Sequence, residues 1–404
     1  MAYSQPMRFF DSPTFRVVSI ALGFLLGSAS IVGLVMQTTR AASLDPGQSK
    51  LDSLVAIESL LAKLATGAQE HGALRVAFLG DSTVHSAIQA KSLPFALDQR
   101  MKSWQSGESS AEVYSIARPA LGSVSFHFLA RDIIAAKPDV IVWQLALVHT
   151  NDYWLRGNTH HEFAGRLSTL DLLEFSLLPI HELGLSLNTL LAYKFLANPG
   201  LRPIWSGLIN EQSRVQKARR ELEQTYSGEG KIGPEKYFLG LQGLRSLADR
   251  FVKVDGRQRS SRGWAVDRLG EALKGIGPDH ILLRSLAKSL EIFRDAGIPV
   301  VIYLGPINIE YLRSINVVNE NLLQASIQAY RDVAQKYGAN FIDLHDVLPD
   351  ASFYDASGHF RASPSLDPAS RIIDGIHPIL VEELERISEI AGSSPSGPLN
   401  ESEL

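Results

Sequence analysis

Residues 74–83 have the sequence Leu-Arg-Val-Ala-Phe-Leu-Gly-Asp-Ser-Thr, and this stretch decides the fold. Its mostly apolar first part, 74–79, predicts a buried β-strand, and Gly80 and Asp81 are typical of a turn. Ser82 then stands where a helix begins, so we expect its hydroxyl at the carboxyl edge of a sheet. The first N–H groups of such a helix suit a negatively charged oxygen at the same edge.

Strands and helices alternate outward from this stretch. Further strands are predicted at 113–117, 140–147, 300–304 and 340–344, and helices at 124–136, 280–295, 317–337 and from His377-Pro378 onward. This alternation predicts an α/β fold, a three-layer, flavodoxin-like parallel sheet flanked by helices. Active sites in such sheets lie at the carboxyl ends of the strands, which is where Ser82 falls.

Residues 373–378, Ile-Asp-Gly-Ile-His-Pro, hold a carboxylate and an imidazole directly before the last predicted helix. A serine hydroxyl becomes a nucleophile when a histidine takes its proton and a carboxylate orients that histidine. We therefore expect Ser82, His377 and Asp374 to act as nucleophile, base and orienting acid. The alternative is a helix cap for Asp374 and an ordinary surface position for His377.

A rival pair lies in residues 353–360, Phe-Tyr-Asp-Ala-Ser-Gly-His-Phe, where Asp355 and His359 are four residues apart. We prefer Asp374 and His377 because their spacing is three residues and a helix follows them. The rival pair is then placed on a loop near the site. The residues that we assign to substrate contact are Asp81, Asn308, Asp355 and His359.

The Gly-Asp-Ser at 80–82 and the Asp-x-x-His at 374–377 resemble the SGNH/GDSL esterase family, over roughly residues 74–152 and 280–392. The resemblance implies a serine enzyme that acts on acyl esters without a cofactor. In related membrane-anchored enzymes the terminal motif is often Phe-x-Asp-x-x-His. Asp355 and His359 therefore remain the alternative acid and base.

The resemblance also implies an oxyanion hole built from the N–H of Ser82, Gly122 and the side chain of Asn151. The chain departs from the family pattern at two places. Ala117 stands where the family has an asparagine, and Asn151 comes about three residues late without its usual glycine. His149 is a substitute for Asn151 as the third donor.

The N-terminal part predicts a membrane anchor. Residues 17–36 are uncharged and long enough to span a bilayer as a helix, and Arg8 and Arg16 precede them. We expect residues 1–16 in the cytoplasm, a linker at 37–50 and the catalytic part outside the cytoplasmic membrane of a bacterial-type cell. The alternative is a secreted protein, cleaved after Thr39-Arg-Ala41.

The remainder, 51–392, is predicted to be one α/β domain interrupted by a helical insertion at 153–279, with a disordered tail at 393–404. The insertion is expected to shape substrate access or to dock on an envelope partner protein. The net charge of −4 does not suggest nucleic-acid binding. With no cysteine and no phosphate-binding glycine loop, we expect neither a thiolate metal site nor a cofactor.

By resemblance, the expected function is an extracytoplasmic serine esterase or O-acyltransferase. Its expected substrates are O-acylated glycans of the cell envelope or an exopolysaccharide, because anchored relatives modify cell-surface polymers. The alternative is a non-catalytic assembly protein of the same fold in polysaccharide export. A transmembrane structural protein without a site would require both motifs to be coincidences.

Overall fold

The structure is a computed structural model. It describes residues 47–67, 73–84, 92–102, 104, 110–118, 121–150, 155, 161–167, 193, 197–198, 269–270, 273, 275–353, 355–356, 358–360 and 367–393. The predicted anchor at 17–36, most of the predicted insertion and the tail therefore lie outside the described residues. Among the described helices, none has both the length and the apolar composition needed to cross a bilayer.

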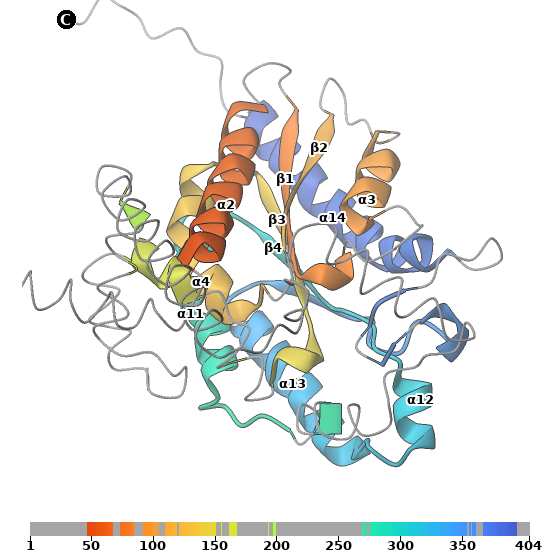
Figure 1. Ribbon diagram of the computed structural model, residues 1–404. Helices are drawn as coiled ribbons and strands as arrows, with labels where there is room; N and C mark the ends of the chain where they lie inside the picture. The colour runs from red at the N-terminus through yellow and green to blue at the C-terminus, as the bar shows by residue number, and fades with distance from the viewer. Residues whose placement is uncertain are drawn as a thin grey trace, which may run out of the picture.

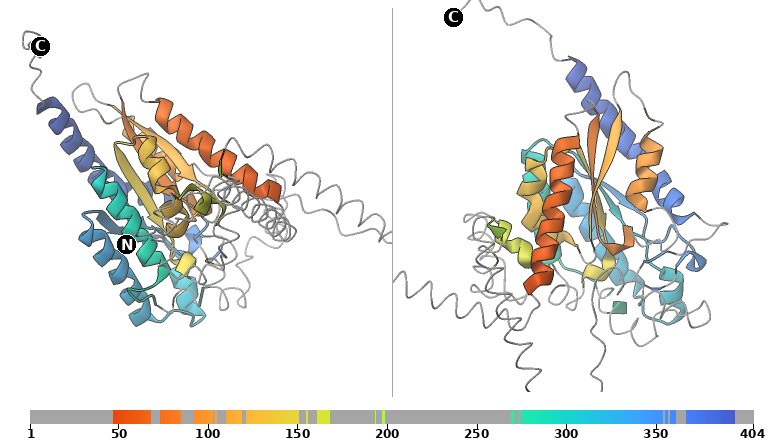
Figure 2. Two further views of the ribbon diagram at one scale, coloured as in Figure 1. Left: turned by 90° about the vertical axis from the view of Figure 1, so that its left-hand side faces the viewer. Right: turned by 45° about the horizontal axis from the view of Figure 1, so that its top comes forward.

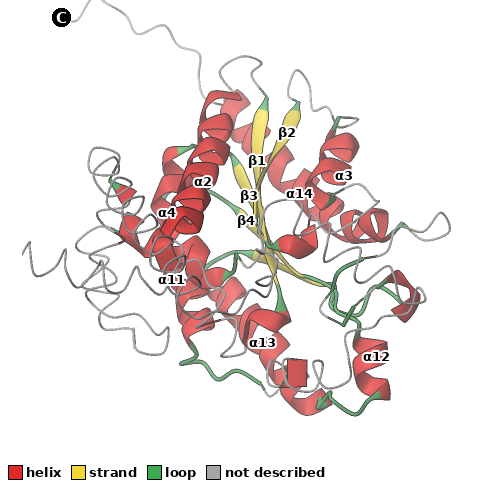
Figure 3. Ribbon diagram, viewed as in Figure 1, coloured by secondary structure: helices red, strands yellow, loops and turns green. Residues whose placement is uncertain are grey.

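Five parallel strands form one sheet in the order β2-β1-β3-β4-β5 (Figures 1 and 3). The strands are β1 (Leu74–Gly80), β2 (Ala111–Ala117), β3 (Val140–Leu145), β4 (Val300–Leu304) and β5 (Asn340–Asp343). The chain passes from β1 to β2 on one side and then to β3 on the other. In open α/β sheets the crevice at such a reversal of strand order is the usual ligand site, so the fold directs attention to the ends of β1 and β3.

Helices cover both faces of the sheet and make it three-layered, as the sequence predicted (Figure 2). One face packs against α2 (Gly47–Gly67), α4 (Ser123–Ala135), α11 (Ile281–Asp295) and α13 (Glu320–Lys336). The other packs against α3 (Leu93–Met101) and α14 (Pro368–Ser393). Short helical segments follow several strands: η2 (Ser82–Val84), η3 (Leu147–Thr150), η5 (His161–Arg166), α12 (Ile309–Ser314) and η8 (Asp350–Ser352).

Apolar burial accounts for the strands, because β3 and β4 are buried along their whole length, as expected when helices cover both faces. Trp143 of β3 packs edge-on against Phe126 of α4 and Phe293 of α11, with ring centroids 5.6 and 6.2 Å apart. The strand predicted at 140–147 is two residues shorter, because the chain turns into η3 at Leu147.

The last helix departs from the sequence prediction. It begins at Pro368 and not at Pro378, which lies inside it. Asp367 caps the true start, since its carboxylate accepts hydrogen bonds from the N–H (3.2 Å) and the hydroxyl (2.7 Å) of Ser370. Asp374 and His377 therefore lie in the body of α14 and not in a turn before it.

Candidate active site

The chain after β1 forms a tight turn held by Asp81. One carboxylate oxygen of Asp81 accepts hydrogen bonds from the N–H (2.7 Å) and the hydroxyl (2.6 Å) of Thr83. Ser82 lies between these two buried residues and begins η2. The turn thereby fixes the backbone on both sides of Ser82 and leaves its side chain partly exposed.

Gln144 of β3 ties this turn to the sheet. Its side-chain oxygen accepts a hydrogen bond from the N–H of Asp81 at 3.2 Å, and its amide donates to the hydroxyl of Thr83. A Cβ at Gly80 would lie 2.9 Å from the Gln144 oxygen, and one at Gly305 only 2.8 Å from its nitrogen. The two glycines therefore leave the space that this amide fills. Sequence analysis missed Gln144, although it is the one polar residue within the apolar strand 140–145.

A closed loop brings the rival pair to the same edge. Phe353 and Phe360 form an antiparallel bridge, their rings pack 5.8 Å apart, and both side chains are buried. Gly358 has a φ of +106°, and a Cβ there would lie 2.6 Å from the carbonyl oxygen of Pro306. The bridge and this close approach hold the loop against the segment that follows β4.

Asp355, His359 and Ser82 form a hydrogen-bonded series. His359 Nδ1 lies 2.6 Å from Asp355 Oδ2, and His359 Nε2 lies 3.2 Å from Ser82 Oγ. Asp355 also accepts a hydrogen bond from the N–H of His359 at 3.2 Å. Because Nδ1–H donates its hydrogen bond to the Asp355 carboxylate, Nε2 is left as the acceptor for the Ser82 hydroxyl. This is the geometry of a serine nucleophile with its base and orienting acid.

The electrostatics of His359 suit a base. Burial of the ring disfavours the imidazolium, but the charge and hydrogen bond of Asp355, with a smaller contribution from Asp81, outweigh it and raise the pKa of His359. The side chain of His359 keeps 22% of its surface exposed, so the pair is accessible from solvent.

The structure therefore brings His359 and Asp355 to Ser82, and not the preferred partners His377 and Asp374. On α14, Asp374 is exposed and pairs with Arg100 of α3 at 3.1 Å. His377 is partly exposed, and its pKa is lowered by burial and by the charge of Arg100, an effect that Asp374 only partly offsets. The assignment failed because Pro378 was taken for the start of the helix, whereas helical geometry carries both side chains to the α3 side.

Gly122 and His149 lie at the carboxyl edge of the sheet, next to each other and near the turn that carries Ser82. Gly122 precedes α4 as its N-cap, and a Cβ there would lie 2.8 Å from His149 Nδ1. His149, at the end of β3, places its Nε2 3.0 Å from Asp81 Oδ2. His149 thus contacts both the Ser82 turn and the start of α4, and it is the residue that the sequence offered as a substitute for Asn151. Asn151 lies outside the described residues.

Asp81 and Asn308 build the site and do not face a substrate. Asp81 is only 3% exposed; burial raises its pKa, but the hydrogen bond and charge of His149 and the bonds from Thr83 lower it more, so the net pKa is lowered. Asn308 is 2% exposed, caps α12 through the N–H of Tyr311 and donates to Asp350 at 2.8 Å. Both were predicted to contact substrate, and the structure instead uses their polar atoms internally.

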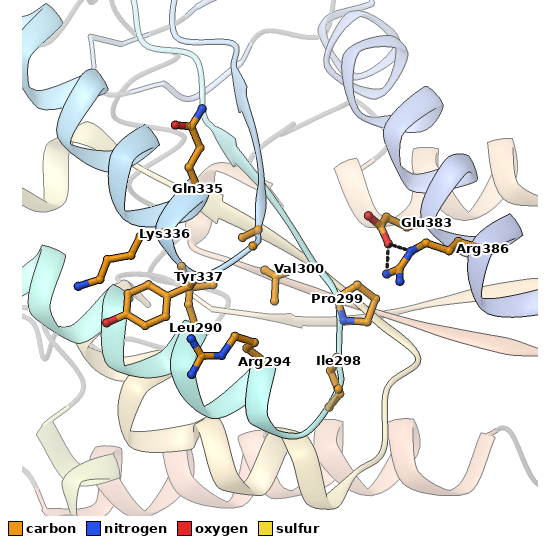
Figure 4. Close-up of a pocket in the computed structure, with 13 residues that line it drawn as sticks. Leu290, Arg294, Ile298, Pro299, Val300, Gln335, Lys336, Tyr337, Glu383 and Arg386 are labelled. Carbon is orange, nitrogen blue, oxygen red and sulfur yellow. Dashed lines mark hydrogen bonds and ion pairs between the residues drawn. The ribbon is translucent and has the colours of Figure 1, made fainter. Parts of the chain in front are cut away.

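A cavity of about 460 Å³ lies at the opposite edge of the sheet (Figure 4). It is lined by residues just before β4 and β5, such as Pro299 and Ala339. Its cationic side chains already have partners, since Arg386 pairs with Glu383 at 2.6 Å and Arg294 lies over the ring of Tyr337. This cavity is therefore separate from the Ser82 site. Among the described residues, no three His, Asp or Glu side chains gather where they would hold a metal ion.

The chain has only distant similarity to known proteins. No protein-family model matches the chain, and the search of curated proteins gave no match. Among solved structures, it is similar to a lipase/acylhydrolase from Enterococcus faecalis, over 78% of this chain and 96% of that one. The identity is 10% and the TM-score 0.31, so the likeness carries no argument about function. The chemistry must be argued from the site.

Proposed function

We propose that the protein is a serine esterase or O-acyltransferase in which Ser82 is the nucleophile, His359 the base and Asp355 the orienting carboxylate. The observation that carries the proposal is the 3.2 Å separation of Ser82 Oγ from His359 Nε2, together with the 2.6 Å contact of His359 Nδ1 with Asp355. A chance pairing of a partly exposed turn serine with a carboxylate-bound histidine would not need the loop 353–360 to be closed at both ends.

The reaction follows from these positions. His359 Nε2 takes the hydroxyl proton as Ser82 Oγ attacks the ester carbonyl carbon, and negative charge develops on the carbonyl oxygen. In this proposal the N–H groups of Ser82 and Gly122 stabilise that charge, and the His149 ring lies next to Gly122. His359 then gives the proton to the leaving oxygen, and the ester C–O bond breaks to leave an acyl group on Ser82. Water or a second hydroxyl takes the acyl group by the reverse path.

The substrate and location are proposed from the sequence. Residues 17–36 anchor the chain in the cytoplasmic membrane with the α/β domain outside, and the acyl esters are those of cell-envelope or exopolysaccharide glycans. Transfer in place of hydrolysis requires that an acceptor hydroxyl occupy the site and exclude water. In this proposal residues 153–279 supply the acceptor contacts or the partner surface.

The rival function is a non-catalytic assembly protein of the same fold. This function is supported by the two places where the sequence departs from the family's oxyanion residues, Ala117 and the segment around Asn151. The contact between Ser82 and His359 favours the enzyme, since an assembly protein has no need of an activated hydroxyl.

The test is covalent labelling of the full chain in membranes with a fluorophosphonate probe, followed by hydrolysis of p-nitrophenyl acetate. Wild type is compared with Ser82→Ala, His359→Ala and the matched control His377→Ala. We expect labelling and hydrolysis in wild type and His377→Ala, and a loss of about 10³-fold or more in the other two variants. Labelling that survives Ser82→Ala, or none in wild type, would reject the proposal.

A further inference from the structure

The direction of α2 places the N-terminal part of the domain beside the active site. α2 ends at Gly67, and only six residues separate it from the start of β1 at Leu74. Six residues extend at most about 22 Å, less than the length of about 31 Å of the 21-residue helix. The helix therefore runs antiparallel to β1, as Figures 1 and 2 show, and begins towards the carboxyl edge of the sheet.

Ion pairs of Arg166 show where the first residue of α2 lies relative to α4. Arg166 of η5 contacts Glu58 of α2 and lies 3.7 Å from Asp132 of α4, so these two residues lie at a similar height along their helices. From Glu58 back to Gly47 is about 16 Å, and from Asp132 back to Ser123 about 14 Å, at 1.5 Å per residue. Both helices start at the carboxyl edge, so Gly47 lies near the height of Ser123, next to the oxyanion residue Gly122.

The proposed anchor ends at residue 36, and ten residues, 37–46, connect it to α2. Ten residues span at most about 36 Å, whatever their conformation. The opposite end of the domain lies farther away. Asn340, the first residue of β5, donates to Glu383 of α14 at 2.9 Å, so the part of α14 after Glu383 extends beyond the amino edge.

We infer that the carboxyl edge of the sheet, with Ser82 and His359, faces the membrane surface, and that the acyl ester on which it acts belongs to a membrane-bound amphiphile. This inference rests on the proposed function and its anchor. The short tether restricts the site to a layer near the headgroups, where an ester held in the same membrane reaches a high effective concentration. An ester dissolved in bulk water gains nothing from the tether.

Orientation is tested first, without reference to activity. Because the chain has no cysteine, single substitutions accept a fluorophore at one place only. Ala351→Cys, exposed beside the Asn308–Asp350 contact, reports the carboxyl edge, and Ile390→Cys, 59% exposed on α14, reports the amino edge. The full chain is placed in phosphatidylcholine vesicles that carry a headgroup-labelled acceptor lipid, and energy transfer is measured for each label.

We expect stronger energy transfer from position 351 than from position 390. Equal transfer, or stronger transfer from position 390, would overturn the orientation. This readout stands even if the protein hydrolyses nothing, so it separates a failure of the orientation from a failure of the proposed function.

The substrate class is tested by lengthening the tether. Forty Gly-Ser residues inserted after Ala42 extend the linker about five-fold, which lowers the effective concentration of the site at the surface about ten-fold. The full chain is assayed in vesicles against a p-nitrophenyl ester with a long acyl chain held in the bilayer, and against soluble p-nitrophenyl acetate.

We expect the ratio of bilayer to soluble activity to fall about ten-fold, with p-nitrophenyl acetate hydrolysis unchanged. Ser82→Ala with either linker gives the background. An unchanged ratio would overturn the membrane-bound substrate. Absence of hydrolysis of both esters in every variant would reject the proposed activity and, with it, the substrate class, and would leave the orientation to the energy-transfer result.

Discussion

His149 Nε2 lies 3.0 Å from Asp81 Oδ2, and this contact connects the end of β3 to the turn that carries Ser82. Both side chains are buried, so the carboxylate is kept ionised mainly by the imidazole beside it, against the effect of burial. The residue before Ser82 is therefore a structural carboxylate, held by a histidine from the end of the neighbouring strand.

Removal of this imidazole should destabilise the protein in a pH-dependent way. In His149→Phe the hydrogen bond and charge of the imidazole are lost, and only the hydrogen bonds from Thr83 still oppose the effect of burial on the pKa of Asp81. We expect the free energy of unfolding at pH 7 to fall by about 3 kcal/mol. The wild-type contribution of Asp81, whose folded pKa is lowered, is present above pH 3.8 and is lost as the pH falls through the folded pKa. Urea unfolding at pH 7 and pH 5 should show the deficit narrowing as the pH falls. His377→Phe is the control, and an equal deficit there would contradict the role of the pair.

Asp355 should set the acid limb of the pH–rate profile. The pKa of His359 is raised because the charge and hydrogen bond of Asp355 outweigh burial. In Asp355→Asn burial dominates, so the pKa falls, His359 stays neutral to lower pH and the acid limb of kcat/KM moves to lower pH. The maximum should drop about 10³–10⁴-fold, because the imidazole is no longer oriented.

Asp374→Asn is the matched control for that experiment. Its pair with Arg100 is exposed, so we expect less than about 0.5 kcal/mol in stability and an unchanged profile. If Asp374→Asn abolished hydrolysis and Asp355→Asn did not, the sequence-based triad would be right after all.

Gly305 should be needed for the position of Gln144. A Cβ at this position would lie 2.8 Å from the Gln144 nitrogen, so Gly305→Ala displaces the amide that holds the Ser82 turn. We expect a fall in kcat of about ten-fold or more, as positioning is lost, with KM little changed. Gly277→Ala is the comparison, since a Cβ there meets nothing within 4 Å. Equal rates in the two variants would show that the turn does not depend on Gln144.

The ionised carboxylate of Asp132 should lower the free energy of unfolding at neutral pH. Burial raises its pKa to about 6, so ionisation above that pH costs stability. The folded state binds more protons than the unfolded state between about pH 4 and 6, so stability falls as the pH rises through this window. Asp132→Asn should therefore stabilise the protein at pH 7 by about 1 kcal/mol, allowing for solvent screening of a side chain that is 32% exposed, and not at pH 4. Thermal unfolding at both values checks this, and a loss of stability at pH 7 would show that the Arg166 contact outweighs burial.

The parallel sheet was predictable because its strands are short apolar runs that end at turn residues. Ser82 was predictable for the same reason, since Gly80 and Asp81 mark the end of β1. All five strands begin and end within two residues of the prediction, and β3 ends at Leu145, just before η3 begins at Leu147.

The contact of His359 with Ser82 was not predictable with the same rules. Asp374 and His377 are three residues apart, the preferred spacing, and a helix was predicted to follow them. The position of Asp355 and His359 instead depends on a bridge between Phe353 and Phe360, which no local sequence pattern predicts. The Asp367-Pro368 pair was the overlooked signal, because an N-cap followed by proline marks the start of a helix better than Pro378 does. The anchor, the insertion and Asn151 remain predictions.

The bridge between Phe353 and Phe360 makes the loop between them a self-contained cassette. Its two ends are paired with each other, and Gly358 holds it against Pro306. The separation of His359 from Ser82 is therefore set by the closure of this loop and not by the helix α14 that follows it. A substitution that opens the bridge should move the imidazole away from the hydroxyl and leave the five-stranded sheet as it is.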